Sequence, residues 1–109
     1  MADSMTKDDF LRSVETTFKE ALALVRKKNA DYTGGSTDPF ANFRTAEIAG
    51  VDPRRAVLLR LLEKVRRVSS LLGADPQVED EPIGATLIDI VNLAALLRVW
   101  CDESRPTLS

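Results

Sequence analysis

The segment from Asp52 to Gly73 constrains the fold most, because it carries both the ends and the periodicity of a long helix. Asp52 is a favourable N-cap residue, Pro53 suits the first helical position, and Gly73 follows the last turn. The apolar residues between them recur at helical spacing and form a broad face: Val57, Leu58, Leu61, Leu62, Val65, Val68, Leu71 and Leu72. Such a wide face predicts contact with more than one partner helix.

Two further segments show the same periodicity. The first is a helix from about Thr6 to Asn29, capped by Thr6, with an apolar face of Phe10, Val14, Phe18, Ala21, Leu22 and Val25. The second is a helix from about Glu81 to Asp102, with Asp80 as cap, Pro82 in its first turn, and an apolar side of Ile83, Leu87, Ile90, Val91, Ala94, Leu97 and Trp100.

A short helical piece is expected from about Phe40 to Ala49, ended by Gly50, and no segment has a clear strand pattern. The predicted fold is therefore all-α, with three long helices and a short one. The 109 residues make a single domain, 1–109, with frayed ends at 1–5 and 103–109. A chain this short cannot easily cover such broad apolar faces, so we expect a homo-oligomer, a dimer or tetramer, to complete the helical bundle.

Composition excludes several classes of function. The net charge of −2 gives no general attraction for a nucleic acid polymer. The sequence lacks an apolar leader and a continuous run of 18 apolar residues, so no membrane span is expected, and the lone Cys101 fits a cytoplasmic location. Histidine is absent, which excludes a Ser-His-Asp triad. Any metal would be held by carboxylates, which suit Mg²⁺.

Asp89 is the least expected residue in the sequence. It lies within the run I-D-I-V-N-L at 88–93, where a carboxylate is costly to bury without a partner. Glu81 and Asn92 share its helical face. We expect Asp89 to be held by a cation from the 53–72 helix, by a metal ion, or by both.

Charged residues also line up on the other two long helices. Arg60, Lys64 and Arg67 form one basic stripe, which favours anions opposite, either carboxylates of another helix or phosphates of a ligand. Glu20 lies with Lys27 and Asp31 on one side of the 6–29 helix. A solvated surface accounts for both stripes equally well.

The stretch from Arg26 to Arg44 is richer than a simple connection between helices requires. It holds Lys28, Asp31 and Tyr32, two adjacent glycines, and a Phe-x-x-Phe pair around Asn42, formed by Phe40 and Phe43. The phenylalanines either anchor the stretch to the helices or stack on a base. A well-packed turn between helices is the simpler alternative.

Four runs together resemble a known family: K-N-A-D-Y at 28–32, D-P-F-A-N-F-R at 38–44, L-R-L-L-E-K-V-R-R at 59–67, and E-D-E-P-I-G-A-T-L-I-D-I-V-N at 79–92. They resemble the nucleotide-modification-associated domain family of all-α phage proteins, which is distantly similar to MazG-type nucleoside triphosphate pyrophosphohydrolases. The resemblance implies a helical, oligomeric protein that handles nucleotides.

The sequence also departs from that pattern. The double-acid motif E-E-x-x-E of the MazG-type enzymes is missing, and Ala85 stands where the family usually has an acid four residues before Asp89. One Mg²⁺ could still be bound by two or three carboxylates, because this ion keeps several waters.

The resemblance and the residues support two functions. The first is Mg²⁺-dependent hydrolysis of a nucleoside triphosphate, with Asp89 and Glu81 catalytic and Glu20, Glu81 and Asp89 holding the metal. The ligand would be bound by Lys28, Asp31, Tyr32, Phe40, Asn42, Phe43, Arg60, Lys64, Arg67 and Asn92. The alternative is a non-catalytic sponge that sequesters a host immune nucleotide, an anti-defence role. An adaptor bundle without a small ligand is a third possibility.

Overall fold

The computed structural model describes residues 4–32, 40–73 and 83–103, except for the side chains of residues 30–32. Its elements are α1 (Lys7–Tyr32), the 3₁₀ helix η2 (Ala41–Ala49), α2 (Pro53–Leu72) and α3 (Ile83–Glu103). No strand occurs in these ranges, which confirms the all-α prediction. The predicted cap Asp80, Pro82 and the extreme ends of the chain lie outside the described residues.

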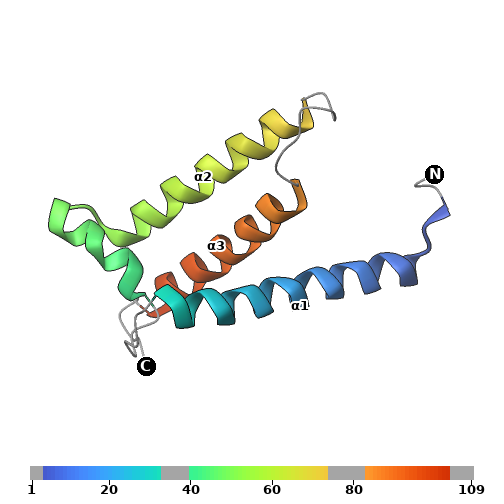
Figure 1. Ribbon diagram of the computed structural model, residues 1–109, viewed down its shortest axis with the longest axis horizontal. Coiled ribbons are helices and arrows are strands. Elements are labelled where there is room, and N and C mark those ends of the chain that lie inside the picture. The colour runs from blue at the N-terminus through green and yellow to red at the C-terminus, as the bar shows by residue number, and fades with distance from the viewer. Residues whose placement is uncertain (1–3, 33–39, 74–82, 104–109) are drawn as a thin grey trace.

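The three long helices make an open, elongated arrangement. Helices α2 and α3 lie side by side and run in opposite directions, and α1 crosses α3 with its N-terminal half extending away from the pair (Figure 1). The radius of gyration is 16.9 Å, whereas a compact domain of this length has about 13 Å. The single chain is therefore less compact than an ordinary monomer.

Several predicted helix ends are confirmed, although α1 continues to Tyr32 instead of ending near Asn29. The backbone N–H of Asp9 donates to the Thr6 hydroxyl at 3.1 Å, before α1. Asp52 caps α2 by accepting the N–H of Arg54 at 2.9 Å, and its carboxylate also pairs with the Arg54 guanidinium. Gly50 ends η2 with a left-handed φ of 73°. These local signals fix where each helix starts or stops.

The left-handed conformation of Gly50 gives a prediction of stability. Gly50→Ala should lower the free energy of unfolding by roughly 1 kcal/mol, because a side chain at positive φ is strained even where space is open. Gly84→Ala is the matched control, since Gly84 lies in α3 and is equally open. It should keep or raise the stability. Urea unfolding followed by circular dichroism measures both, and equal losses would contradict the role of φ.

The core lies where η2 meets the α2–α3 pair. Phe40, Val57 and Trp100 are buried together, and the partly buried residues packed on them are Phe43, Leu93, Leu96 and Leu97. The Phe40 and Trp100 rings stack with centroids 4.4 Å apart. Of the described residues, only Val57 has a large side chain that is completely buried. The core is therefore small.

The apolar face predicted to make α1 a core helix is largely exposed. Ala21 is buried, but Phe10, Phe18 and Leu22 are 55%, 60% and 49% exposed. Helix α3 meets only one edge of that face, around Ala21, Leu24 and Lys28. Helix α2 likewise leaves large apolar side chains exposed: Leu58, Leu59, Leu62, Val65 and Leu72. The described helices leave both faces largely uncovered.

Among the described helices, α3 alone is long and apolar enough to span a membrane by length and composition, with a mean hydropathy of 1.6. Core helices of soluble proteins share this property. Here α3 contacts both α1 and α2 and carries an ion-paired aspartate. The cytoplasmic location and the lack of a membrane partner stay predictions.

Candidate functional site

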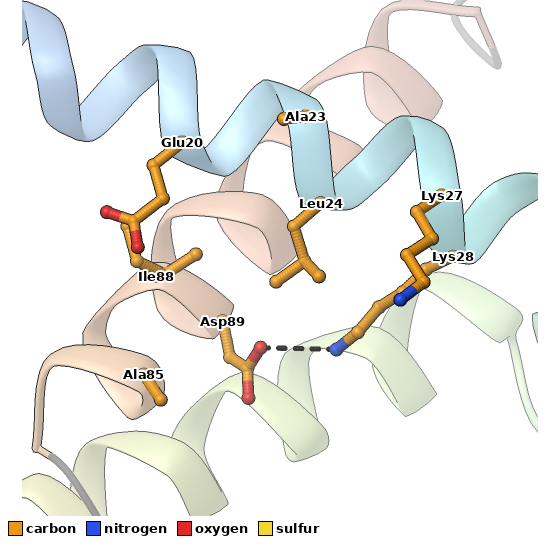
Figure 2. Close-up of a pocket in the computed structure, with 8 residues that line it drawn as sticks. All are labelled: Glu20, Ala23, Leu24, Lys27, Lys28, Ala85, Ile88 and Asp89. Atoms are coloured by element: carbon orange, nitrogen blue, oxygen red, sulfur yellow. Dashed lines mark hydrogen bonds and ion pairs between the residues drawn. The ribbon is translucent and has the colours of Figure 1, made fainter.

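The Asp89 carboxylate lies where the three long helices meet. Its Oδ2 is 3.1 Å from the Nζ atom of Lys64 on α2. Its Oδ1 is 3.3 Å from the Nζ atom of Lys28 on α1, the contact drawn in Figure 2. The Asp89 and Lys64 side chains are 22% and 24% exposed, and that of Lys28 is 43% exposed. We call these three residues the Asp89 centre. The expected cation from the 53–72 helix is confirmed as Lys64, while Lys28 is a second partner that was not foreseen.

The two ammonium groups keep Asp89 ionised. Partial burial opposes the charged form, but the hydrogen bond from Lys64 and the charge and hydrogen bond of Lys28 outweigh it, so the pKa of Asp89 lies below its ordinary value of 3.8. The centre thus contains one negative and two positive charges at neutral pH. Its net positive charge favours an additional anion.

A groove between α1 and α3 opens beside this centre. It has a volume of about 530 Å³. Its lining combines an apolar floor with charged groups at the rim: Glu20, Ala23, Leu24, Lys27, Lys28, Ala85, Ile88 and Asp89 (Figure 2). Lys27 adds a second ammonium group, beside that of Lys28, to the groove. Sequence reasoning placed Lys27 in a stripe with Glu20 but did not assign it to a ligand.

Ala85 lies in the groove one helical turn before Asp89 on α3. The Ala85 methyl group occupies the position where the family that this sequence resembles usually has an acidic residue. The groove therefore has one fewer carboxylate next to Asp89 than that family pattern implies.

The predicted metal ligands are only partly brought together. Glu20 and Asp89 line the same groove, Glu20 from α1 and Asp89 from α3 (Figure 2). Glu81 lies outside the described residues. In the described part of the chain, no three acidic or cysteine side chains cluster as a metal site would require. Glu20 and Asp89 suit a single Mg²⁺ only if a lysine leaves Asp89, because both carboxylate oxygens of Asp89 are already paired.

Other predicted ligand-binding residues flank the centre. Arg60 and Arg67 lie one turn before and after Lys64 on α2, and both side chains are exposed. Asn92 follows Asp89 by almost one turn on α3 and is half-buried. Asp31 and Tyr32 belong to the last turn of α1, but their side chains lie outside the described part.

The aromatic residues form a separate group around Trp100. Phe40 stacks on the Trp100 ring. The Phe43 ring packs edge-on against Trp100, with the ring centroids 6.5 Å apart. The Arg44 guanidinium lies 5.4 Å from the Trp100 ring centroid. Phe40 therefore anchors its stretch to the helices, which is one of the two roles expected from the sequence. Asn42 is exposed on η2. Trp100 follows Asp89 by three turns of α3, about 16 Å along the helix axis. The predicted ligand-binding residues therefore divide into two groups.

The described fold and centre define an all-α protein with a lysine-paired carboxylate at the junction of three helices. Comparisons with protein-family models, with characterised proteins and with solved structures found no match to this chain. The resemblance to MazG-like proteins stays an expectation from sequence.

Proposed function

We propose that this protein binds a nucleotide, with the phosphates held at the Asp89 centre and in the adjoining groove. The observation that carries the proposal is the pairing of both Lys28 and Lys64 with one carboxylate, Asp89, beside a groove that Lys27 also lines. Phosphate groups are suitable anions for such a cluster, since ammonium groups form strong charge-assisted hydrogen bonds with them. The apolar floor, which includes Leu24 and Ile88, gives a base or sugar a surface to contact.

In the hydrolytic form of the proposal, the protein cleaves a nucleoside triphosphate. Asp89 and Glu20 would hold Mg²⁺, which when bound supplies an activated water and neutralises phosphate charge. Lys28 is the more exposed partner of Asp89, so it can turn towards an incoming phosphate and leave one carboxylate oxygen open. Lys64 remains to orient the carboxylate.

Sequestration without cleavage is the second candidate. Two observations favour it: both oxygens of Asp89 are paired with lysines, and the groove has Ala85 where a further acid would stand. A site with more ammonium groups than carboxylates binds phosphate well but is poorly equipped to hold a metal. A phage protein of this kind would bind a host signalling nucleotide and release it chemically unchanged.

The test is thermal stability against a panel of linear and cyclic nucleotides, with and without Mg²⁺. A ligand at about 100 times its dissociation constant should add roughly 2.7 kcal/mol to the stability. Each hit is then incubated and assayed for pyrophosphate release. Mg²⁺-dependent release supports hydrolysis, while a metal-independent shift with intact ligand supports sequestration. No stabilisation by any nucleotide would refute both.

Substitution locates the site. Lys28→Ala should weaken nucleotide binding about tenfold or more, because a hydrogen bond to a charged group contributes roughly 1.5–3 kcal/mol. Lys19→Ala is the control, since Lys19 lies on the same helix and, within the described part of the chain, pairs only with Glu15, in an exposed position. Asp89→Ala should weaken the Mg²⁺-dependent part of binding. Equal effects of the two lysine substitutions would show that the ligand binds elsewhere.

A further inference from the structure

The N-terminal half of α1 has almost no contact with the other described elements. From Ser4 to Glu20 every residue is exposed except the half-buried Val14. Figure 1 shows this half of the helix extending beyond the α2–α3 pair. In proteins most of the stability of a helix comes from packing of its amphipathic face against other elements. An exposed helix with a strong apolar face therefore needs a covering surface.

Apolar residues of α1, all exposed except the half-buried Val14, form a continuous stripe, and the exposed Phe10 lies to one side of it. At 100° per residue, the stripe spans about 80° of the helix circumference. Phe18 and Leu11 are 60% and 61% exposed. The complete stripe, which we call the α1 stripe, consists of Leu11, Val14, Phe18, Leu22 and Val25. Contiguous apolar surfaces of this kind mark interaction sites.

The α1 stripe is symmetric about Phe18. Val14 and Leu22 lie four residues before and after it, and Leu11 and Val25 lie seven residues before and after it. Two copies paired in opposite directions would therefore place Phe18 against Phe18, Val14 against Leu22, and Leu11 against Val25. A surface that complements itself in this way is what a two-fold symmetric dimer requires.

The charges beside the stripe select the antiparallel direction. Asp8 and Arg26 are 18 residues apart, which is five helical turns, so they lie on the same edge of the stripe. In an antiparallel pair, Asp8 of one copy lies near Arg26 of the other. In a parallel two-fold pair this edge would face the opposite edge of the partner's stripe, so Asp8 and Arg26 would not lie against each other. The helix dipoles also favour the antiparallel direction.

We propose that a second copy of this chain covers the α1 stripe, forming an antiparallel α1–α1 dimer with its two-fold axis at Phe18. This inference concerns a surface away from the Asp89 centre and does not depend on nucleotide binding. Sedimentation equilibrium of the full chain at micromolar concentration should give twice the mass of 12.0 kDa.

Phe18→Glu tests the stripe. The variant should lower the dimer affinity at least a hundredfold and sediment as a monomer, while circular dichroism confirms that it is helical. Thr16→Glu is the control, because Thr16 is exposed on the opposite side of α1. It should remain dimeric. A monomeric wild-type chain, or a Phe18→Glu variant as dimeric as the wild type, would overturn the proposal.

A charge swap tests the direction. Asp8→Arg alone and Arg26→Asp alone should each weaken the dimer, because each brings like charges together, and the double variant should recover most of the affinity. Additive weakening in the double variant would overturn the antiparallel pairing. Loss of the dimer in Leu62→Glu but not in Phe18→Glu would assign the interface to α2 and likewise overturn it.

Discussion

Replacing Trp100 with alanine is expected to lower the free energy of unfolding by about 3–5 kcal/mol, the usual loss when a buried tryptophan is truncated. Trp100 is 7% exposed and joins α3 to η2 through the stacked Phe40 ring. Stacking adds roughly 0.5–1.5 kcal/mol to the burial of such a pair. Since single domains are stable by only about 5–15 kcal/mol, this variant should be close to unfolding at room temperature.

The measurement is urea unfolding followed by circular dichroism, because Trp100 is the only tryptophan and its fluorescence is lost with it. Trp100→Phe is the informative companion, since it keeps a ring for Phe40 to stack on and should lose less stability. Leu72→Ala is the surface control, because Leu72 is 74% exposed. A Trp100→Ala loss as small as that of Leu72→Ala would show that this cluster is not the core.

Asp89→Asn should lower the stability at pH 7 by about 2 kcal/mol, within the range for hydrogen bonds to charged groups. The substitution keeps the size of the side chain but leaves Lys28 and Lys64 facing each other without a countercharge. Most of the loss should come from Lys64, because the more exposed Lys28 is better screened by water.

The stability difference between wild type and Asp89→Asn should decrease as the pH is lowered. The folded protein lowers the pKa of Asp89 below 3.8, so the carboxylate stabilises the fold at any pH above that ordinary value. The advantage of wild type over Asp89→Asn should shrink as the pH falls below 3.8 and through the lowered pKa. Urea unfolding of both proteins at several pH values measures the difference.

Asp102→Asn is the matched control, because Asp102 pairs with Arg98 one turn away on the same helix and is 51% exposed. Its loss should stay within about 0.5 kcal/mol. If Asp89→Asn and Asp102→Asn behaved alike, the Asp89 centre would be an ordinary surface ion pair.

The elements could be predicted from the sequence because their signals are local. Thr6, Gly50 and Asp52 each determine a helix end through bonds to neighbouring backbone groups. The cost of an unpaired carboxylate in an apolar run likewise identified Asp89 and a cation from α2. These inferences need no knowledge of how the helices pack.

The packing could not be predicted in the same way. The apolar side of α1 indicated a core face, but α3 meets only its edge, because the crossing position of α1 depends on the whole chain. The ion pair between Lys28 and Asp89 could not be predicted for the same reason, because the two residues are 61 positions apart in the sequence. The aromatic pair Phe40 and Phe43 allowed two roles, and only the position of Trp100 favours anchoring.

The long sequence separation within the Asp89 centre has a consequence for the order of folding. Helices α2 and α3 are neighbours in the sequence and share the most extensive contact, so their pairing closes only a short loop. The bond from Lys28 to Asp89 closes a loop of 61 residues. Contacts between distant parts of a chain form late, so α1 should dock last onto a preformed α2–α3 hairpin. Salt, which screens the lysines, should then slow this final step more than the first.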